Sequence, residues 1–215
     1  KLSEEHFLNI NKVQGIVLTS RVVRPVGPRF YQTVVDIEIE KNDKPPSREI
    51  LKRFAELGFL GINLPEKYGG AGLSHFEAVL VLEEIAKISI AVAFPVFESS
   101  FGPALAISSF APDELKKEVL PKVCLGDMVI AVSMSEPNAG SALTDLTTKA
   151  NIFEDKVVLN GQKRWCSGAG HADAYVVYSR MSEEKGAKGI GAVLLEKNTK
   201  GFTFGNCFIC CGTYC

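Results

Sequence analysis

The chain has 215 residues, of which 46% are hydrophobic, enough to bury the core of one large domain or two small ones. Its 24 basic and 25 acidic side chains give a net charge of −1, which argues against a nucleic-acid partner. The most apolar stretch, residues 88–110, is interrupted by two prolines and a glutamate. It therefore falls short of the ~20 unbroken apolar residues that a membrane span needs. The first residues, KLSEEHFLN, are acidic where a signal peptide is basic and then apolar, which favours a reducing compartment.

The first part of the chain predicts helices. Ser3 caps the first one, whose apolar residues recur at helical spacing at Phe7, Ile10, Val13 and Val17. The polar residues 41–46 then form a linker. Ser47 caps a second helix that ends at Gly58 and carries one apolar face, made of Ile50, Leu51, Phe54 and Leu57.

Residues 58–74 predict a long loop, because they contain five glycines. Ser74 and Glu77 have the spacing of a capping box. The helix that they begin has apolar residues at Phe76, Val79, Leu80, Ile85 and Ala86. Two further helices are predicted over residues 103–110 and 113–119.

The pattern changes near Gly126, after which short apolar segments alternate with turns. Strands are predicted at residues 127–133, at 149–153 and 156–160 around an acidic turn, at 174–179 and 190–196, and at 202–204. Helices first and strands second indicate an α+β fold. We expect a helical domain over residues 1–123, an incomplete β-domain over 124–205 and an atypical tail over 206–215.

The tail concentrates cysteines, at Cys207, Cys210, Cys211 and Cys215. This spacing is compatible with zinc or with a disulfide cluster. However, no histidine lies near it in sequence and no second ligand cluster faces it, so we predict no metal site. The favoured interpretation is that the tail is foreign to the fold.

Residues 131–143, AVSMSEPNAGSAL, form the most informative stretch. A strand ends in hydroxyl residues and then enters a turn of small side chains, so hydroxyls and backbone N–H groups are exposed at a sheet edge. Such a turn can approach a flat polar ring or a phosphate closely. On its own, one short turn motif favours an ordinary exit from a strand.

Residues 160–170, NGQKRWCSGAG, form the second stretch and carry the only tryptophan, Trp165, with Ser167 two residues later. An indole can pack against an aromatic cofactor while a neighbouring hydroxyl binds its polar edge. The alternative is a tryptophan of the core.

Together, SEPNAGS (135–141) and NGQKRWCS (160–167) resemble two motifs of the acyl-CoA dehydrogenase family. LGFLGINLPEKYGGAGLS (57–74) and ELKKEVLPKVCLGD (114–127) also resemble that family, in the same order, so the resemblance covers residues 1 to about 204. It implies a helical domain followed by an antiparallel, barrel-like β-domain. The family's further helical domain, which carries the catalytic glutamate, would lie beyond this sequence, so the architecture is expected to be truncated.

The resemblance implies FAD as the cofactor, bound against the β-domain. Ser135 matches the hydroxyl that contacts the flavin, and Met134 supplies adjacent backbone. The other residues implied near the cofactor are Gly140, Ser141, Trp165, Cys166 and Ser167. Among these, Ser141 also contacts the acyl-CoA substrate, and Trp165 packs on the flavin.

Two positions depart from the family pattern. Ala142 stands where an aspartate is common, which removes a charge that would brace the loop. Cys166 replaces an aliphatic residue and is tolerated as a small hydrophobe. Glu136, followed by a proline, is interpreted as structural, and the three histidines have no partner pattern.

The resemblance implies oxidation of an acyl-CoA thioester at its α and β carbons, with hydride transfer to flavin. We expect no catalytic residue and no activity in this chain alone. The implied partners are acyl-CoA, an electron-transfer flavoprotein and, at full length, further copies of the protein, in the bacterial cytoplasm or the mitochondrial matrix. Two alternatives stay open: an acyl-CoA oxidase that uses oxygen, and a non-catalytic interaction module.

Overall fold

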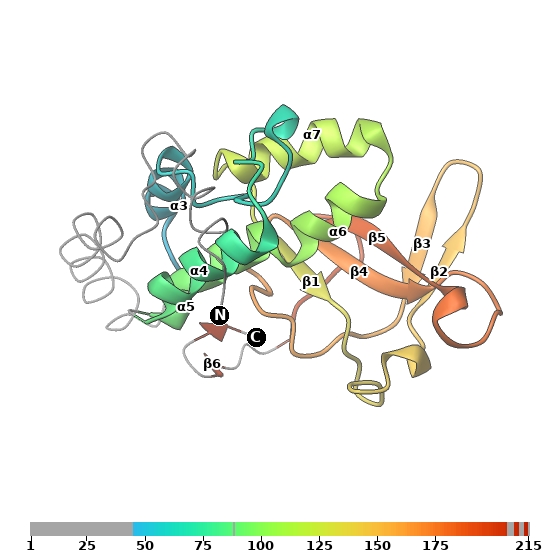
Figure 1. Cartoon of the computed structure of the whole chain (residues 1–215). Helices are drawn as coiled ribbons and strands as arrows, with labels where there is room; N and C mark the ends of the chain where they lie inside the picture. The colour runs from blue at the N-terminus through green and yellow to red at the C-terminus, as the bar shows by residue number, and fades with distance from the viewer. Residues whose placement is uncertain (1–44, 88, 206–208, 211–212, 215) are drawn as a thin grey trace, which may run out of the picture.

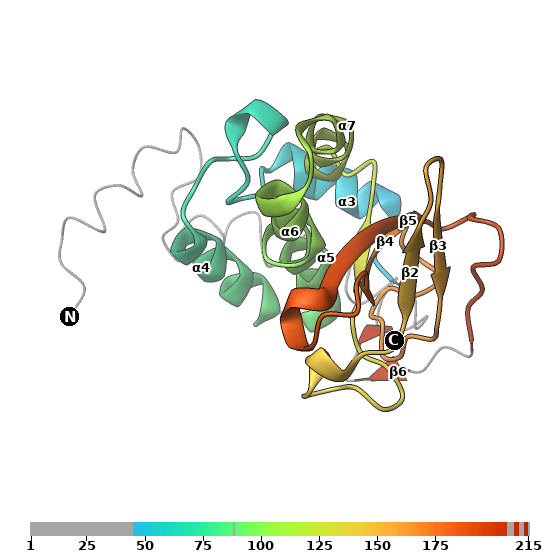
Figure 2. The same cartoon turned by 90° about the vertical axis from the view of Figure 1, so that its right-hand side faces the viewer.

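The structure is a computed structural model that describes residues 45–205 apart from residue 88, and residues 209–210 and 213–214. Helices gather beside a five-stranded sheet (Figure 1), and the view turned by 90° shows the same two parts (Figure 2). The α+β class is thereby confirmed. The helix predicted after Ser3 lies outside the described residues, and so do most of the linker and most of the cysteine-rich tail.

Helix α3 (Arg48–Glu56) has the start, the end and the face that its sequence predicts. The hydroxyl of Ser47 accepts a hydrogen bond from the N–H of Ile50 at 3.4 Å, and Gly58 follows the helix with a φ of 73°. The buried residues of α3 are Ile50, Leu51 and Phe54.

The glycine-rich loop, residues 58–74, is fixed against helix α5 (Ile90–Ser100) and includes a short 3₁₀ turn, Glu66–Tyr68. The N–H groups of Gly61 and Ile62 donate to the hydroxyls of Ser99 and Ser100, both at 3.2 Å. A β-carbon at Gly70 would lie 2.2 Å from the carbonyl oxygen of Leu64. The loop therefore requires glycine there because two backbone segments touch.

Helix α4 (His75–Ala86) begins with the predicted capping box of Ser74 and Glu77. Its predicted apolar face is only partly correct, because Ala78, Val81 and Ile85 are buried whereas Phe76 and Val79 are exposed. Helix α5 is absent from the sequence prediction. Its own buried residues, which include Val92, Val96 and Ser100, lie on several sides of the helix, so the sequence shows no amphipathic period. The helix also contains Pro95.

Helices α6 (Pro103–Phe110) and α7 (Asp113–Cys124) match the last two predicted helices, although α7 continues past residue 119 and through Pro121. By length and composition alone, Ile90–Phe110 could cross a membrane, with a mean hydropathy of 1.6. Half of that window is buried inside the fold, and Phe101 and Gly102 separate α5 from α6. These are features of a core helix pair.

Strand β4 (Ala174–Arg180) lies at the centre of the sheet. It pairs along its whole length with β5 (Ile190–Glu196), antiparallel, and its first four residues pair with β1 (Ile130–Ser133), parallel. At its far end Arg180 pairs with Lys149 of β2 (Lys149–Ile152), also parallel. The hairpin partner of β2 is β3 (Val157–Asn160).

The expectation of an antiparallel sheet is therefore wrong, because the described sheet is mixed. Parallel neighbours need a long connection, and residues 134–173 provide it between β1 and β4 with a short 3₁₀ helix, Leu143–Asp145, but without an α-helix. Closure into a barrel is not found among the described strands. Residues 202–204 do not form a strand either. The rings of Phe202 and Phe204 instead pack on Tyr175, with centroids 5.1 Å and 5.6 Å from its ring.

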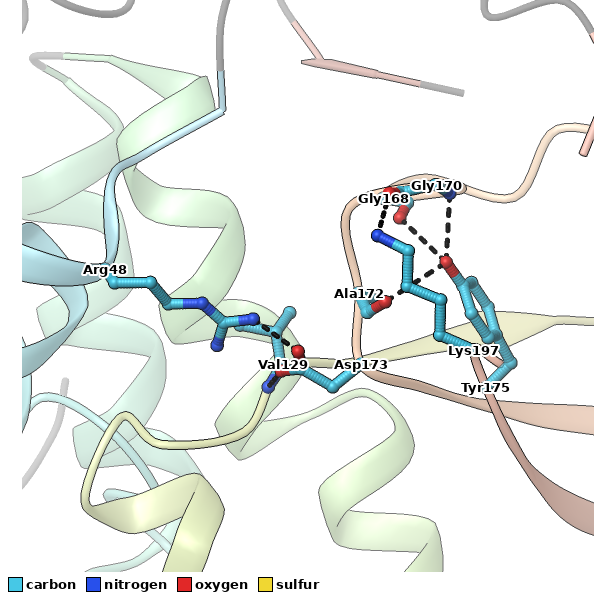
Figure 3. A network of polar contacts seen from close by, with 8 residues as sticks. All are labelled: Arg48, Val129, Gly168, Gly170, Ala172, Asp173, Tyr175 and Lys197. Atoms are coloured by element: carbon cyan, nitrogen blue, oxygen red, sulfur yellow. Dashed lines mark hydrogen bonds and ion pairs between the residues drawn. The ribbon is translucent and has the colours of Figure 1, made fainter. Parts of the chain in front are cut away.

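The helices and the sheet share one hydrophobic cluster, in which Leu120 and Val123 of α7 pack with Ile130 of β1 and Val176 of β4. A polar link reinforces this contact (Figure 3). Asp173 accepts hydrogen bonds from Arg48 of α3 at 2.5 Å and from the N–H of Val129 at 2.7 Å.

A second set of contacts in Figure 3 orders the turn before β4. The hydroxyl of Tyr175 accepts from the N–H of Gly170 at 2.9 Å and lies 3.4 Å from the carbonyl oxygen of Ala172. Lys197, just after β5, donates to the carbonyl oxygen of Gly170. The turn is thus held from both β4 and β5.

The two partners of Asp173 predict different effects of substitution. Arg48→Met removes an ion pair whose side chains are both more than a third exposed, so we expect a loss of less than about 1 kcal/mol in the free energy of unfolding. Asp173→Ala also leaves the N–H of Val129 without its acceptor, and we expect about 1–3 kcal/mol. Urea titrations of both variants test this, and equal losses would contradict it.

Candidate functional site

The turn after β1 is narrow and leaves its outer side open. The N–H of Glu136 donates to the carbonyl oxygen of Ala139 at 2.8 Å, and the reverse bond is 3.3 Å long. Beyond this bridge Gly140 and Ser141 are exposed, and a β-carbon at Gly140 would meet no atom within 4 Å. Backbone and small side chains are therefore accessible at the sheet edge, as the sequence predicts.

The structure brings the two sequence motifs side by side. The N–H of Arg164 donates to the carbonyl oxygen of Ser135 at 2.8 Å. The hydroxyl of Ser133, the last residue of β1, lies 3.0 Å from the sulfur of Cys166. Residues 160–168 thus run along the exit of β1, although the motifs are separated by a whole hairpin in sequence.

Trp165 combines an unusual backbone with an exposed side chain. Its φ is 58°, and it is the only residue other than glycine with a positive φ in the described part of the chain. A bulky residue is rare in this left-handed region, and such strain concentrates at functional sites. Its side chain is 60% exposed, so the alternative of a core tryptophan is wrong.

Glu136 is buried and accepts four hydrogen bonds. One carboxylate oxygen accepts from the N–H and the hydroxyl of Thr147, at 2.7 and 2.8 Å. The other accepts from the N–H of Thr148 at 2.9 Å and from Lys163 at 2.8 Å. Burial alone would raise the pKa of Glu136, but the bonds from Lys163, Thr148 and Thr147 outweigh it and lower the pKa to about 2.

The structural role expected of Glu136 is thus to join the turn after β1 to Thr147, Thr148 and Lys163. Its partner, Lys163, was not singled out from the sequence, although it lies inside the second motif. Lys163 also donates to the carbonyl oxygen of Met134 at 2.9 Å. The sequence signal that could reveal this pair is an acidic residue in the first motif together with a lysine two residues before the tryptophan of the second motif.

The remaining predicted site residues divide into two groups. The hydroxyls of Ser135, Ser141 and Ser167 make no hydrogen bond to any residue that the structure describes, so they can bind a ligand. The carbonyl of Met134 and the thiol of Cys166 are engaged with Lys163 and Ser133.

The loop that contains Ala142 has another brace in place of the missing aspartate. Arg180, at the end of β4, donates to the carbonyl oxygen of Thr144 at 2.6 Å. The same guanidinium also binds the carbonyl oxygens of Glu184 and Gly186, at 3.0 and 2.9 Å. The loop after Ser141 is therefore tied to β4 and to the connection that follows it.

A second carboxylic acid, Glu98 of α5, is buried away from these motifs. It lines a small cavity together with residues that include Leu51, Ala104 and Ile130. One of its oxygens has no hydrogen-bond partner among the described residues. Burial raises the pKa of Glu98 to about 8, so the side chain is a neutral acid at pH 7.

Two family models match the chain: "Acyl-CoA dehydrogenase, N-terminal domain" over residues 27–127 and "Acyl-CoA dehydrogenase, middle domain" over residues 131–209. The chain belongs to the acyl-CoA dehydrogenase family. Where the two predicted domains divide, at residues 123 and 124, stays a prediction.

Curated relatives agree with this assignment. The mitochondrial isobutyryl-CoA dehydrogenase of Dictyostelium discoideum is 32% identical over 95% of this chain and 50% of its own length. An acyl-CoA dehydrogenase of Bacillus subtilis (strain 168) is 33% identical over 89% of this chain and 50% of its own length. The chain thus spans about half the length of the curated relatives that it matches.

Solved structures show the same fold. The butyryl-CoA dehydrogenase of Megasphaera elsdenii superposes with a TM-score of 0.74 at 30% identity, over 84% of this chain and 49% of that one. The FAD complex of PigA superposes with a TM-score of 0.75 at 28% identity, over 84% of this chain and 48% of that one. A structure of the electron transferring flavoprotein of Acidaminococcus fermentans superposes with a TM-score of 0.78 at 30% identity, over 88% of this chain and 50% of that one.

The raised pKa of Glu98 predicts a pH-dependent stability. The unfolded chain ionises this group from about pH 4.5 upward, whereas the folded chain keeps it neutral until about pH 8. Unfolding therefore becomes easier between these values. We expect Glu98→Gln, which cannot ionise, to exceed the native chain in unfolding free energy by on the order of 4 kcal/mol at pH 8 and by little at pH 4.5.

Denaturant titrations at both pH values measure this difference. Glu114→Gln, which changes an exposed glutamate on α7, is the matched control and is expected to shift neither titration. A difference between Glu98→Gln and the native chain that does not grow with pH would contradict the prediction.

Proposed function

We propose that this chain forms one wall of a flavin site and contributes it to the FAD-dependent dehydrogenation of an acyl-CoA thioester. The observation that carries the proposal is the joining of the two family motifs, with Trp165 exposed in a left-handed conformation beside Ser135. Family membership supplies the chemistry, and the FAD complex of PigA supports the cofactor.

The residues present fit a flat, polar aromatic cofactor. The exposed indole of Trp165 offers a stacking surface. The hydroxyls of Ser135 and Ser167 are free to bind polar ring atoms, and the open side of Gly140 allows a ligand to approach the backbone. Met134 and Cys166, whose polar groups are already bonded within the protein, would support this surface rather than contact the ligand.

FAD, when bound, supplies the hydride acceptor. The chain's own part is to bind and orient, with Ser141 at the edge shared with the acyl-CoA. Glu136 is a poor candidate for the base that removes the α-proton, because four donors hold its carboxylate and its pKa is about 2. We therefore assign no catalytic residue in this chain.

The partners and the compartment are part of the same proposal. An electron-transfer flavoprotein is the proposed electron acceptor, and the likeness to the structure from Acidaminococcus fermentans supports it. At full length we propose further copies of the protein as partners. The mitochondrial and bacterial relatives support the mitochondrial matrix or the bacterial cytoplasm as the compartment.

Replacing the proposed flavin contacts tests the site. We expect Trp165→Ala with Ser167→Ala to weaken FAD binding by roughly tenfold or more, because stacking and a ring-edge hydrogen bond are both lost. Fluorescence titration of FAD measures the affinity. The control is Phe153→Ala, which removes an aromatic ring of similar exposure, 54%, at the end of the hairpin. Equal affinity in the native chain and the double variant would refute the assignment.

Catalysis by the 215-residue chain alone should be undetectable, because we assign no positioned base among the residues that the structure describes, and loss of such a group costs about 10²–10⁴-fold. The assay supplies FAD, an artificial electron acceptor and acyl-CoAs of several lengths. Turnover at roughly 1–10³ s⁻¹, the usual range for enzymes, would show that the chain holds a base that we have not recognised. Oxygen consumption in place of dye reduction would favour the oxidase alternative.

A further inference from the structure

The ion pair between Glu136 and Lys163 differs from the other pairs of the described residues. Its two side chains are 3% and 11% exposed. In each of the others at least one side chain is more than a third exposed. A buried pair is not retained for stability as such, since an apolar pair of similar volume often stabilises a fold as well. The role of this pair is therefore sought in the chain segments that it joins.

Three segments meet at this pair. Glu136 belongs to the turn after β1, Thr147 and Thr148 lead into β2, and Lys163 follows β3. Lys163 also binds the carbonyl oxygen of Met134. The pair thus holds the segment that carries Trp165 against the turn that carries Ser135.

Residues 160–163 approach the start of β2 so closely that position 161 has no room for a side chain. A β-carbon at Gly161 would lie 2.4 Å from the hydroxyl oxygen of Thr148 and 2.6 Å from its α-carbon. Glycine therefore lets residues 160–163 approach the start of β2, which brings Lys163 within reach of Glu136. This observation is independent of the charges.

We propose that the Glu136–Lys163 pair is a positioning element that holds Trp165 in its left-handed conformation beside Ser135. Only Arg164 separates Lys163 from Trp165, and the N–H of Arg164 is bonded to Ser135. The strained residue is thus fixed from its N-terminal side by three hydrogen bonds to the turn, two from Lys163 and one from Arg164. The consequence for flavin binding rests on the function proposed above, whereas the consequence for Trp165 does not.

The experiment uses the fact that Trp165 is the only tryptophan of the chain. Its fluorescence anisotropy and its quenching by acrylamide report on this one position without any ligand. Lys163→Met removes the charge and keeps most of the volume, and Gly161→Ala displaces the same segment while both charged side chains are retained. Lys163→Arg restores the charge. The control is Lys149→Met, which breaks a pair with Glu183 whose side chains are 55% and 92% exposed.

We expect Lys163→Met and Gly161→Ala to lower the anisotropy of Trp165 while far-ultraviolet circular dichroism shows that both remain folded. Lys163→Arg should recover part of the native signal, and Lys149→Met should equal the native chain. The dissociation constant for FAD should rise about tenfold or more in Lys163→Met, as expected when a supporting group is displaced. If Lys163→Met does not fold, Gly161→Ala and Lys163→Arg carry the test.

Failure of the positioning role and failure of the flavin role give different results. Unchanged anisotropy and quenching in the folded variants would overturn the positioning role, whatever the flavin affinity. If Trp165 responds as expected while neither the native chain nor any variant binds FAD, the positioning role stands and the proposed function fails for this chain.

Discussion

The candidate site depends on one constraint in the sheet, namely that β1 and β2 lie along the same edge of β4. β1 occupies the first part of that edge and β2 pairs only with Arg180 at its end. The chain must therefore leave the edge after Ser133 and return to it at Lys149. The turn motif lies in this excursion, and Glu136 closes it by binding Thr147 and Thr148 near its end. The open face at Gly140 follows from that path.

Much of the local structure could be predicted because its causes are local. Ser47 and Ser74 cap helices through atoms three residues away, and the acidic turn joins β2 and β3. Helix α5 could not be predicted, since a helix surrounded by other elements lacks the alternation of apolar and polar faces that reveals a surface helix. The parallel pairing of β1 and β4 could not be predicted either, because the usual sign, an α-helix between the strands, is absent.

The candidate site likewise has features that the sequence predicts and features that it does not. The residues of both motifs could be named from their resemblance to a family, but their proximity is a property of the sheet and its connections. The exposure of Trp165 and its left-handed backbone could not be derived from the residue types alone, since tryptophan is usually buried. Lys163 was overlooked because a lysine in a hairpin segment ordinarily faces solvent, and only the burial of Glu136 distinguishes it.

The hydrophobic cluster shared by α7, β1 and β4 crosses the boundary between the two family models, which meet between residues 127 and 131. A boundary between sequence families is therefore not a boundary in packing. Separating the chain there would expose Val123 on one piece and Ile130 and Val176 on the other, so each half would present part of a core to solvent. The two parts should then unfold in a single cooperative transition. Replacing one part by that of a relative should therefore preserve folding only if the cluster residues of the other part are replaced with it.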